Sequence, residues 1–322
     1  MVVQRLDVEE FRGIKRCETP IELSAFNILI GRNNSGKSTI LEALSLLPGL
    51  KVHDYFTDKE KIQELLNLHR SVPKDNKSLI YLYAGSSKIQ YFIDHELKEV
   101  VITENDYREL FRKEKLVNYD SIGKFFEVSD KQLRDSVIFI PNNTSIIEKM
   151  ETKMKSLKEL IMKKGFHVKV AESLSKCVDD IYSEMVFLDP MSIRKVFPGN
   201  SVYIELRDLG AGAEKAIKLM ALLEAVNPKL LLIDDFGAGF HPALIRMVLN
   251  WLKEKEWQVV ISTHNIDVLY NLIEVNLEKA TIIQLYKSDE DILSHNVLTL
   301  NDLEDLFNAN TDPRLLTDAL HL

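Results

Sequence analysis

Short apolar runs alternate with amphipathic stretches through the last third of the chain. Runs without polar positions are typical of strands buried on both faces, and apolar residues at helical spacing indicate helices with one buried side. In chain order, the pattern predicts strand Val202–Leu206, helix Glu214–Ala225, strand Leu230–Ile233, helix Pro242–Lys253, strand Val259–Ile261 and helix Ile266–Ile273. This alternation predicts an α/β fold in which helices flank a mostly parallel sheet.

The first 50 residues also contain a strand followed by a helix. Phe26–Ile30 is an apolar run that we predict as a buried strand, and Ser38–Leu47 has the spacing of a helix. The segment before this pair has the pattern of strands, so we expect an N-terminal antiparallel β portion. We therefore assign residues 1–50 to an N-terminal lobe and residues 201–322 to a C-terminal lobe of one fold.

The interval 51–200 has a different pattern and is predicted as an inserted β/helical lobe with an arm. Residues 51–135 are polar and rich in charge. Short strand-like runs occur within the interval at Leu79–Tyr83, Lys88–Ile93, Val100–Thr103 and Val137–Ile140. Between the first two runs, Ala84–Ser87 predicts a hairpin turn.

The segment Ser145–Lys164 has the periodicity of a helix. One face of that helix carries Ile146, Ile147, Met150, Met154, Leu157, Leu160 and Ile161. An apolar stripe of this kind either packs against the body of the protein or forms an exposed interaction face. We favour packing against the body.

Gly31–Ser38 fits the pattern G-x-x-x-x-G-K-[ST] of a phosphate-binding P-loop. Its glycines allow consecutive backbone N–H groups to turn inward around phosphate oxygens, and the next helix adds the positive end of its dipole. We expect Lys37 to reach the β- and γ-phosphates and the Ser38 hydroxyl to ligate Mg²⁺. The flanking strand and helix favour this reading over a glycine loop that only turns the chain. The predicted nucleotide-binding residues are Gly31, Arg32, Asn33, Asn34, Ser35, Gly36, Lys37, Ser38 and Thr39.

Acidic residues and a histidine follow two of the predicted buried strands. Asp234 and Asp235 come directly after Leu230–Ile233, at the sheet edge where ligands bind in open α/β sheets. We predict that Asp234 holds Mg²⁺ and that Asp235 orients or deprotonates the attacking water. His264 follows Val259–Ile261, where it can reach the γ-phosphate. The predicted catalytic residues are thus Lys37, Asp235 and His264.

A second glycine-rich segment, Arg207–Lys215, precedes the helix predicted at Glu214. Two glycines at a helix N-terminus make an anion-binding nest, although a loop with a helix cap explains them equally well. Because one P-loop already supplies the first phosphate site, the second nest is explained if it acts on the nucleotide of another copy of the chain.

The chain has 322 residues and a formal net charge of −8, which argues against a protein that binds nucleic acid over its whole surface. Lysines nevertheless predominate between 149 and 176, as either a solvated helix face or a nucleic-acid contact. The two cysteines form no metal set, and we find no membrane-spanning run and no signal-peptide pattern. These features predict a cytoplasmic protein without membrane insertion.

In this order, the motifs resemble those of ABC-type P-loop ATPases, and specifically the SMC/RecF/OLD-like branch with its standalone ATPases. The resemblance rests on Leu6–Ile14 with its F-R-G turn, Gly31–Thr39 as Walker A, Leu209–Lys215 as signature motif, Leu231–Pro242 as Walker B and D-loop, and Ser262–Asn265 around the switch histidine. It implies an ABC-ATPase head that uses ATP and Mg²⁺ and closes as a head-to-tail homodimer on nucleotide binding. The residues it assigns are Gly210, Ala211, Gly212, Glu214 and Lys215 as the signature acting in trans, and Gly239, His241 and Pro242 as the D-loop.

The sequence departs from the family pattern at several of these positions. Asp235 stands where the family usually has Glu, and Ala211 stands where the signature often has Ser. No glutamine follows Val137–Ile140 in the place of the Q-loop, for which Asn142 or Asn143 is a weak substitute. These departures bear on the rate of turnover more than on nucleotide binding.

Three functions follow from the resemblance. The first is an ATP-hydrolysing dimeric switch that drives a separately encoded effector in DNA processing, repair or anti-phage defence, with DNA as a possible ligand. The second is the nucleotide-binding subunit of a transporter, and the third is a slow or non-hydrolysing ATP-gated scaffold. The interval 51–200 is too short for the long coiled coil of SMC-like relatives, so we expect a compact lobe with short helices.

Overall fold

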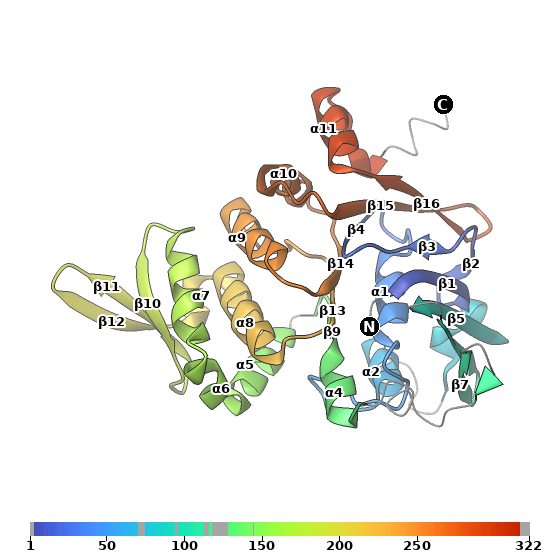
Figure 1. The fold of residues 1–322 in the computed structure, drawn as a ribbon, viewed down its shortest axis with the longest axis horizontal. Helices are drawn as coiled ribbons and strands as arrows, with labels where there is room; N and C mark the ends of the chain where they lie inside the picture. The colour runs from blue at the N-terminus through green and yellow to red at the C-terminus, as the bar shows by residue number, and fades with distance from the viewer. Residues whose placement is uncertain are drawn as a thin grey trace.

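One large mixed sheet runs through the chain and positions most of the predicted motifs (Figure 1). The computed structural model describes residues 3–69, 75–93, 96–112, 116–117, 128–143 and 145–315. Within them, the 13-stranded sheet has the order β8-β7-β6-β5-β1-β2-β16-β15-β4-β14-β13-β9, with β3 paired to β1. Its strands are β1 Val3–Phe11, β2 Ile14–Cys17, β3 Ile21–Glu22, β4 Phe26–Ile30, β5 Ser86–Ile93, β6 Glu96–Thr103, β7 Tyr107–Arg112, β8 Leu116–Val117, β9 Val137–Ile140, β13 Leu230–Ile233, β14 Gln258–Ser262, β15 Ala280–Lys287 and β16 Ile292–Leu298.

Helices cover both faces of this sheet, and a second, three-stranded sheet lies apart from it. The α-helices are α1 Lys37–Ser45, α2 Lys61–Leu68, α4 Asp130–Ser136, α5 Ile146–Ser156, α6 Lys158–Lys163, α7 Phe166–Ser175, α8 Ala211–Val226, α9 Pro242–Lys253, α10 Ile266–Val275 and α11 Leu300–Asn308. The short 3-10 helices are η1 Lys77–Leu79, η2 Tyr81–Tyr83, η3 Leu206–Leu209 and η4 Pro313–Leu315. The second sheet consists of β10 Ile181–Val186, β11 Ser192–Phe197 and β12 Asn200–Glu205.

The centre of the large sheet is parallel. Strands β9, β13, β14, β4 and β15 pair in parallel, and β4, β9, β13 and β14 are buried at every position. Alternate residues of these strands enter two apolar cores, one under α8, α9 and α10 and the other under α1 and α2. Because both faces are covered, the strands are largely apolar, with Asn27 of β4 and Gln258 and Ser262 of β14 as buried polar exceptions. The predicted α/β fold with a mostly parallel core sheet is confirmed.

The predicted N-terminal antiparallel β portion is also present. β1 pairs in antiparallel fashion with β2, β3 and β5, and the same pattern continues through β6, β7 and β8. β2 joins this portion to the core through β16, which forms an antiparallel hairpin with β15. The sheet is thus parallel where the P-loop strand lies and antiparallel beyond it.

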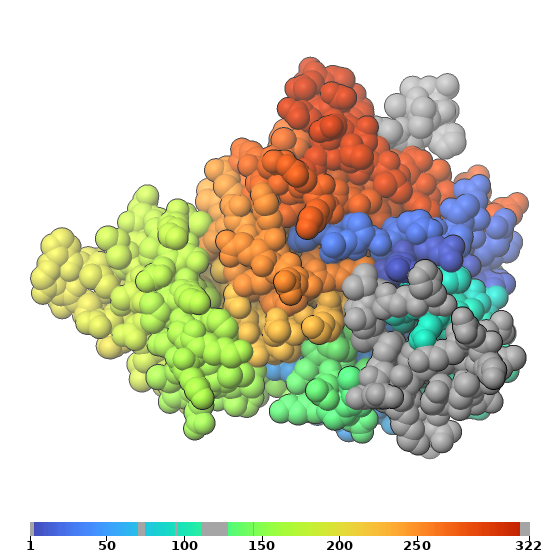
Figure 2. Space-filling model, viewed as in Figure 1, coloured from blue at the N-terminus to red at the C-terminus, as the bar shows by residue number. Residues whose placement is uncertain are grey.

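A smaller lobe projects from the body beside α8 (Figures 1 and 2). It contains α5, α6, α7 and the sheet β10–β12, and the residues of α7 and β10 pack into the same apolar core as α8. Residues 51–200 are therefore spread over several places, because β5–β8 extend the large sheet and β9 pairs with β13. The division of the chain into segments 1–50, 51–200 and 201–322 stays a prediction.

The helical stripe predicted in Ser145–Lys164 packs against the body. The helix is interrupted, and α5 ends before Leu157 while α6 begins after it. Ile146, Met150, Met154 and Ile161 are buried, and Ile147, Leu157 and Leu160 pack against the same core. The stripe is therefore a packing surface and not an exposed interaction face.

Two local predictions were wrong. Leu79–Tyr83 is not a strand but two 3-10 turns, in which Leu82 and Tyr83 adopt positive φ and lie exposed. The hairpin was therefore misplaced, since β5 pairs with β6 and not with a strand before Ala84. Val202–Leu206 corresponds to β12, which belongs to the antiparallel lobe and not to the parallel core.

Candidate functional site

The P-loop connects β4 to α1 at the carboxyl edge of the parallel core. Gly31 and Gly36 both have positive φ, at 136° and 99°. A Cβ placed on Gly31 would lie 2.2 Å from the Leu285 carbonyl oxygen, so a side chain there would clash with the backbone of β15. Glycine is thus required for the loop to pass this close to the neighbouring strand.

Lys37, the first residue of α1, folds back over the loop. Its Nζ donates to the carbonyl oxygens of Gly31 at 2.9 Å and Arg32 at 2.6 Å, and to Ser35 Oγ at 3.3 Å. Burial lowers the pKa of Lys37 to about 8, while the carboxylates of Asp234 and Asp235 act against that shift. The ammonium group therefore lies inside the loop, where the sequence pattern predicts phosphate.

Ser38 and Asp234, the predicted magnesium ligands, lie against each other. Ser38 Oγ donates to the Asp234 carboxylate at 3.1 and 3.0 Å from its two oxygens. Ser262, at the end of β14, donates its hydroxyl to Asp234 Oδ1 at 2.6 Å and accepts from the Asp235 N–H at 2.8 Å. Ser262 is buried and links both acidic residues, a role that the sequence pattern did not predict.

Asp235 has a left-handed backbone, with φ of 51°. Its Oδ2 accepts from Asn142 Nδ2 at 3.0 Å, and Asn142 is exposed just beyond β9. Strand β9 is the neighbour of β13, so the position that follows it faces the acidic pair. Of the two residues considered for the Q-loop, Asn142 is the one that contacts Asp235.

His264 lies in the loop between β14 and α10 and is exposed. Its pKa is lowered by partial burial and then by the nearby charge of Lys37, while Asp235 and Asp234 act in the opposite direction. Strand β14 pairs with the P-loop strand β4 on one side and with β13 on the other, so His264 follows at the sheet edge where Lys37 and the acidic pair lie. The structure therefore brings together the three residues predicted as catalytic.

The second glycine segment lies at the start of α8. Gly210 and Ala211 are exposed, and Gly210 caps the helix with φ of 92° and no side-chain hydrogen bond. A Cβ on Gly212 would lie 2.3 Å from the Gly239 carbonyl oxygen, so the helix start packs tightly on the predicted D-loop of the same chain. The start of α8 is thus an exposed helix N-terminus, whose first N–H groups have no partner within the helix.

Glu214 and Lys215 are held within their own chain. Glu214 accepts from the Lys218 ammonium at 2.6 Å, and this ammonium also donates to Glu151 of α5 at 2.7 Å. Lys215 lies 5.4 Å from the ring centroid of Phe240, and burial lowers its pKa against the opposing effect of Asp235. Their side chains therefore fix α8 to its neighbours.

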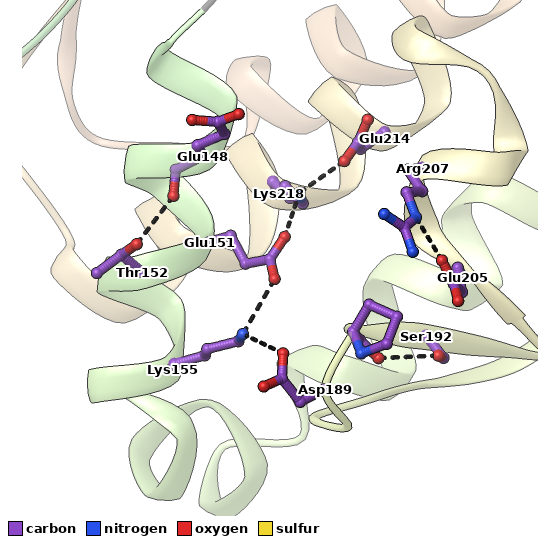
Figure 3. A network of polar contacts seen from close by, with 11 residues as sticks. Glu148, Glu151, Thr152, Lys155, Asp189, Ser192, Glu205, Arg207, Glu214 and Lys218 are labelled. Carbon is purple, nitrogen blue, oxygen red and sulfur yellow. Dashed lines mark hydrogen bonds and ion pairs between the residues drawn. The ribbon is translucent and has the colours of Figure 1, made fainter.

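Figure 3 shows that the contact from Glu214 continues into the projecting lobe. Lys218 is 2% exposed on its side chain and lies between Glu214 and Glu151. Glu151 also pairs with Lys155 at 3.2 Å, and Lys155 pairs with Asp189 at 3.0 Å. A line of alternating charges thus connects the start of α8 with α5 and with the segment before β11.

The predicted D-loop residues surround the start of α9. Gly239 has φ of 76°, His241 is the N-cap and Pro242 is the first helical residue. His241 Nδ1 accepts from the Ala243 N–H at 3.3 Å, as an N-cap side chain does. Gly239 and His241 are exposed beside Gly212, which makes this corner available to a second molecule.

A polar cavity of about 450 Å³ lies on the other side of the P-loop. It is lined by the rim of the loop and by the turn between β15 and β16, including Arg32, Asn33, Lys287, Ser288 and Asp289. Because β4 lies between β14 and β15, this cavity and the acidic pair are on opposite sides of the loop. The loop is thus approachable from two directions.

The residues at the edge fit Mg²⁺ bound together with a nucleotide. Mg²⁺ is held by one or two carboxylates together with phosphate oxygens and water, and Ser38 and Asp234 provide a hydroxyl and a carboxylate side by side. Among the described residues, no group of three or more His, Cys, Asp or Glu side chains could hold a metal alone. The described helices include none long and apolar enough to cross a membrane.

Solved structures of SMC heads share the fold of this chain. A crystal structure of an SMC head bound to the C-terminal winged-helix domain of ScpA superposes with a TM-score of 0.62 and 14% identity, covering 94% of this chain and 99% of that one. An SMC head from Pyrococcus furiosus gives 0.60 at 14% identity over 95% and 98%, and one from Thermotoga maritima gives 0.54 at 17% over 92% and 99%. These likenesses show that the chain has the fold of SMC head domains.

Residues 26–269 match the family model AAA_21, described as "AAA domain, putative AbiEii toxin, Type IV TA system", and the chain belongs to this family. Its curated relatives include the DNA replication and repair proteins RecF of Vibrio campbellii and Vibrio cholerae, each 54% identical over 48 residues. That match covers 15% of this chain and 13% of the RecF proteins. The chain therefore matches only a small part of those relatives.

Proposed function

We propose that this protein binds and hydrolyses ATP with Mg²⁺ at the carboxyl edge of its parallel core. In this proposal the P-loop holds the phosphates, Lys37 contacts the β- and γ-phosphates, and Ser38 with Asp234 holds Mg²⁺, which neutralises phosphate charge. Asp235 orients the attacking water and accepts its proton, and His264 contacts the γ-phosphate. The family and the fold support ATPase chemistry, while the residue roles are our assignment.

The observation that carries this proposal is the contact between Ser38 and Asp234. The two residues are 196 positions apart, yet the hydroxyl lies 3.0 and 3.1 Å from the two carboxylate oxygens. A P-loop hydroxyl and an acidic residue at the end of another strand of the parallel core are the protein groups that a Mg-nucleotide requires. Ser262 holds Asp234 in this position through its buried hydroxyl.

We further propose that the site is completed by a second copy of the chain. Ala211 and Gly210 expose the open N-terminus of α8, yet the P-loop of the same chain already has the start of α1 as its own helix end. In a head-to-tail homodimer closed by ATP, the P-loop of one copy and the start of α8 of the other copy would bind the same nucleotide. Such a dimer explains why one chain has both helix ends. Binding would shift the population toward the closed dimer, since contacts to the nucleotide in trans exist only there.

The closing dimer is proposed to act on a separately encoded effector in DNA processing, repair or defence. The SMC head quoted above was crystallised with a domain of ScpA, which supports a protein partner for this chain. Five lysines of the segment 149–176 have no carboxylate partner among the described residues, which supports a contact with DNA. They are Lys158, Lys163, Lys164, Lys169 and Lys176.

A slow or non-hydrolysing ATP-gated scaffold is the second candidate. Asn142 binds the carboxylate of Asp235, which is already one methylene shorter than the glutamate usual in the family. A shorter carboxylate that is held by an amide activates water less readily. None of the relatives reported above is a transporter subunit.

ATP binding and hydrolysis by the purified protein test the proposal. We expect Mg-ATP to bind and phosphate to be released, and we expect Lys37→Ala to weaken binding by about a hundredfold because a charge-assisted contact is lost. Lys163→Ala, an exposed lysine on α6, is the matched control and should leave both quantities unchanged. If the wild-type protein binds no ATP, the proposed function is wrong; stable ATP-bound dimers without phosphate release would select the scaffold.

A further inference from the structure

The C-terminal part of the described chain returns to the helix that follows the switch histidine. α11 lies beside α10, and the ring of Phe307 stacks on that of Tyr270 with centroids 4.0 Å apart and planes 14° apart (Figure 1). After α11 the chain continues to η4, outside the residues 26–269 matched by the family model. We refer to residues 311–315 as the C-terminal strap.

The strap is anchored on the core sheet. Gln284 of β15 is fully buried and donates its amide Nε2–H to the Pro313 carbonyl oxygen at 3.0 Å. The Gln284 Oε1 accepts from Asn296 Nδ2 at 3.2 Å, so both ends of this amide are bonded. Because β15 pairs with β4, Pro313 is held in a fixed position relative to the P-loop strand.

From this anchor Arg314 reaches the loop of residues 263–265 between β14 and α10, which contains His264 and which we call the switch loop. Its Nη1 donates to the His264 carbonyl oxygen at 2.5 Å, while Nε and Nη2 donate to the Asp312 carboxylate at 2.9 and 2.5 Å. Asp312 also accepts from the Arg314 backbone N–H at 2.9 Å. A planar guanidinium bound by a carboxylate in this forked manner has little freedom to turn away.

The residues on either side of His264 are fixed by the core. The Thr263 N–H donates to the Leu29 carbonyl at 3.1 Å, and its hydroxyl donates to the Phe236 carbonyl at 2.8 Å. Asn265 caps α10 through its side chain, which accepts from the Asp267 N–H at 2.8 Å. Arg314 adds the contact at His264 itself, between these two points.

We propose that Arg314 is a positioning residue for His264, and that the C-terminal strap holds the switch loop in the geometry needed for turnover. The inference rests on the proposed function, because it assigns Arg314 to the same nucleotide site. Arg314 acts on the backbone of His264, so it is expected to influence the step that uses the imidazole and not the binding of the phosphates by the P-loop. A displacement of about 1 Å at a reacting group is enough to slow a reaction strongly.

Arg314→Ala tests the proposal by two independent measurements. We expect kcat for ATP to fall about tenfold, with the Kd for ATP within about twofold of wild type, because the P-loop is untouched. Hydrogen–deuterium exchange of the nucleotide-free protein should be about tenfold faster for the amides of residues 263–266, as the loop opens more often. Arg314→Lys keeps one donor for the His264 carbonyl and should recover part of both losses.

Arg246→Ala is the matched control, since it removes an exposed guanidinium that pairs with Glu274 and Asn271 on α10. It should change neither kcat nor exchange at residues 263–266. Unchanged exchange and unchanged kcat in Arg314→Ala would overturn the inference, as would equal losses in Arg246→Ala. A wild-type protein without ATPase activity would refute the proposed function, while the exchange measurement would still decide whether Arg314 holds the loop.

Discussion

Two regions of the molecule, the carboxyl edge of the parallel core and the projecting lobe of α5–α7 and β10–β12, differ in their polar contacts. At the core edge, short polar side chains at strand ends and at the start of α1 bond to one another, as Asp234, Ser262 and Ser38 do. In the lobe, long charged side chains pair across helices, and Lys218 joins α8 to Glu151 of α5. Short side chains have few rotamers and fix a geometry, whereas long charged pairs connect elements over a greater distance.

This difference assigns separate tasks to the two regions. The core edge carries the residues proposed to bind and hydrolyse ATP, and the lobe is attached to the helix proposed to act in trans. Changes at the core edge should therefore affect chemistry, whereas changes in the lobe should affect stability and interactions while ATP binding is preserved.

The largest effect is expected for Asp235→Asn at the core edge. Removing a general base lowers kcat by about 10²- to 10⁴-fold, while KM should change little because the P-loop is intact. Steady-state phosphate release measures both parameters. Asp305→Asn, an exposed carboxylate on α11, is the control. A variant with undiminished kcat would show that Asp235 is not the base.

The next largest effect is expected on the free energy of unfolding, when a truncated side chain in the core is compared with one in the lobe. Leu232→Ala, on fully buried β13, should lower the free energy of unfolding by about 2–5 kcal/mol through lost transfer energy and a cavity. Val202→Ala, on exposed β12, should lower it by no more than about 0.5 kcal/mol. Urea titrations followed by circular dichroism measure both. Equal losses would contradict the contrast between core and lobe.

Lys218→Met should have an intermediate effect. The variant leaves Glu151 and Glu214 without their shared cation, and both side chains retain some exposure, so we expect a loss of about 1–3 kcal/mol. Adding Glu151→Gln should restore part of that stability. The Kd for ATP should remain that of wild type, and a large rise in this Kd would place Lys218 in the binding site itself.

The smallest effect is expected at the unpaired lysines. Reversing Lys164 and Lys169 to Glu should weaken binding of the ATP-bound protein to double-stranded DNA by about tenfold at low salt. The wild-type affinity should fall steeply as salt rises, and fluorescence anisotropy measures both. Lys153→Glu, a lysine already paired with Asp58, is the control. If the charge reversal leaves DNA binding unchanged, these lysines are not the DNA contact.

The sequence pattern predicted the core and its edge well because strands buried on both faces leave short runs that are almost entirely apolar. β4, β9, β13 and the acidic pair after β13 were all placed on that basis. The pattern wrongly predicted a strand at Leu79–Tyr83, since the apolar side chains there occur in 3-10 turns that include exposed residues. β12 was recognised as a strand, but periodicity does not report that it pairs with the preceding strand β11 and not with the parallel core.

The supporting residues of the site had no comparable signal. Ser262 is one of many serines, and only the fold places its hydroxyl between Asp234 and the Asp235 N–H. Arg314 lies 50 positions after His264, and no local motif connects them. Residues that bear the chemistry follow recognisable spacings, whereas those that hold them in place depend on tertiary contacts between distant segments.

The central claim, that one copy supplies the P-loop and another supplies the start of α8, is tested most directly by mixing two inactive variants. Lys37→Ala removes the P-loop cation, and Ala211→Asp puts a carboxylate at the exposed start of α8. In a mixed head-to-tail dimer, one of the two sites combines an intact P-loop with an intact helix start. Equal mixing should therefore restore roughly a quarter of wild-type ATPase activity. If each variant alone is inactive and the mixture is inactive too, the site is not shared between copies.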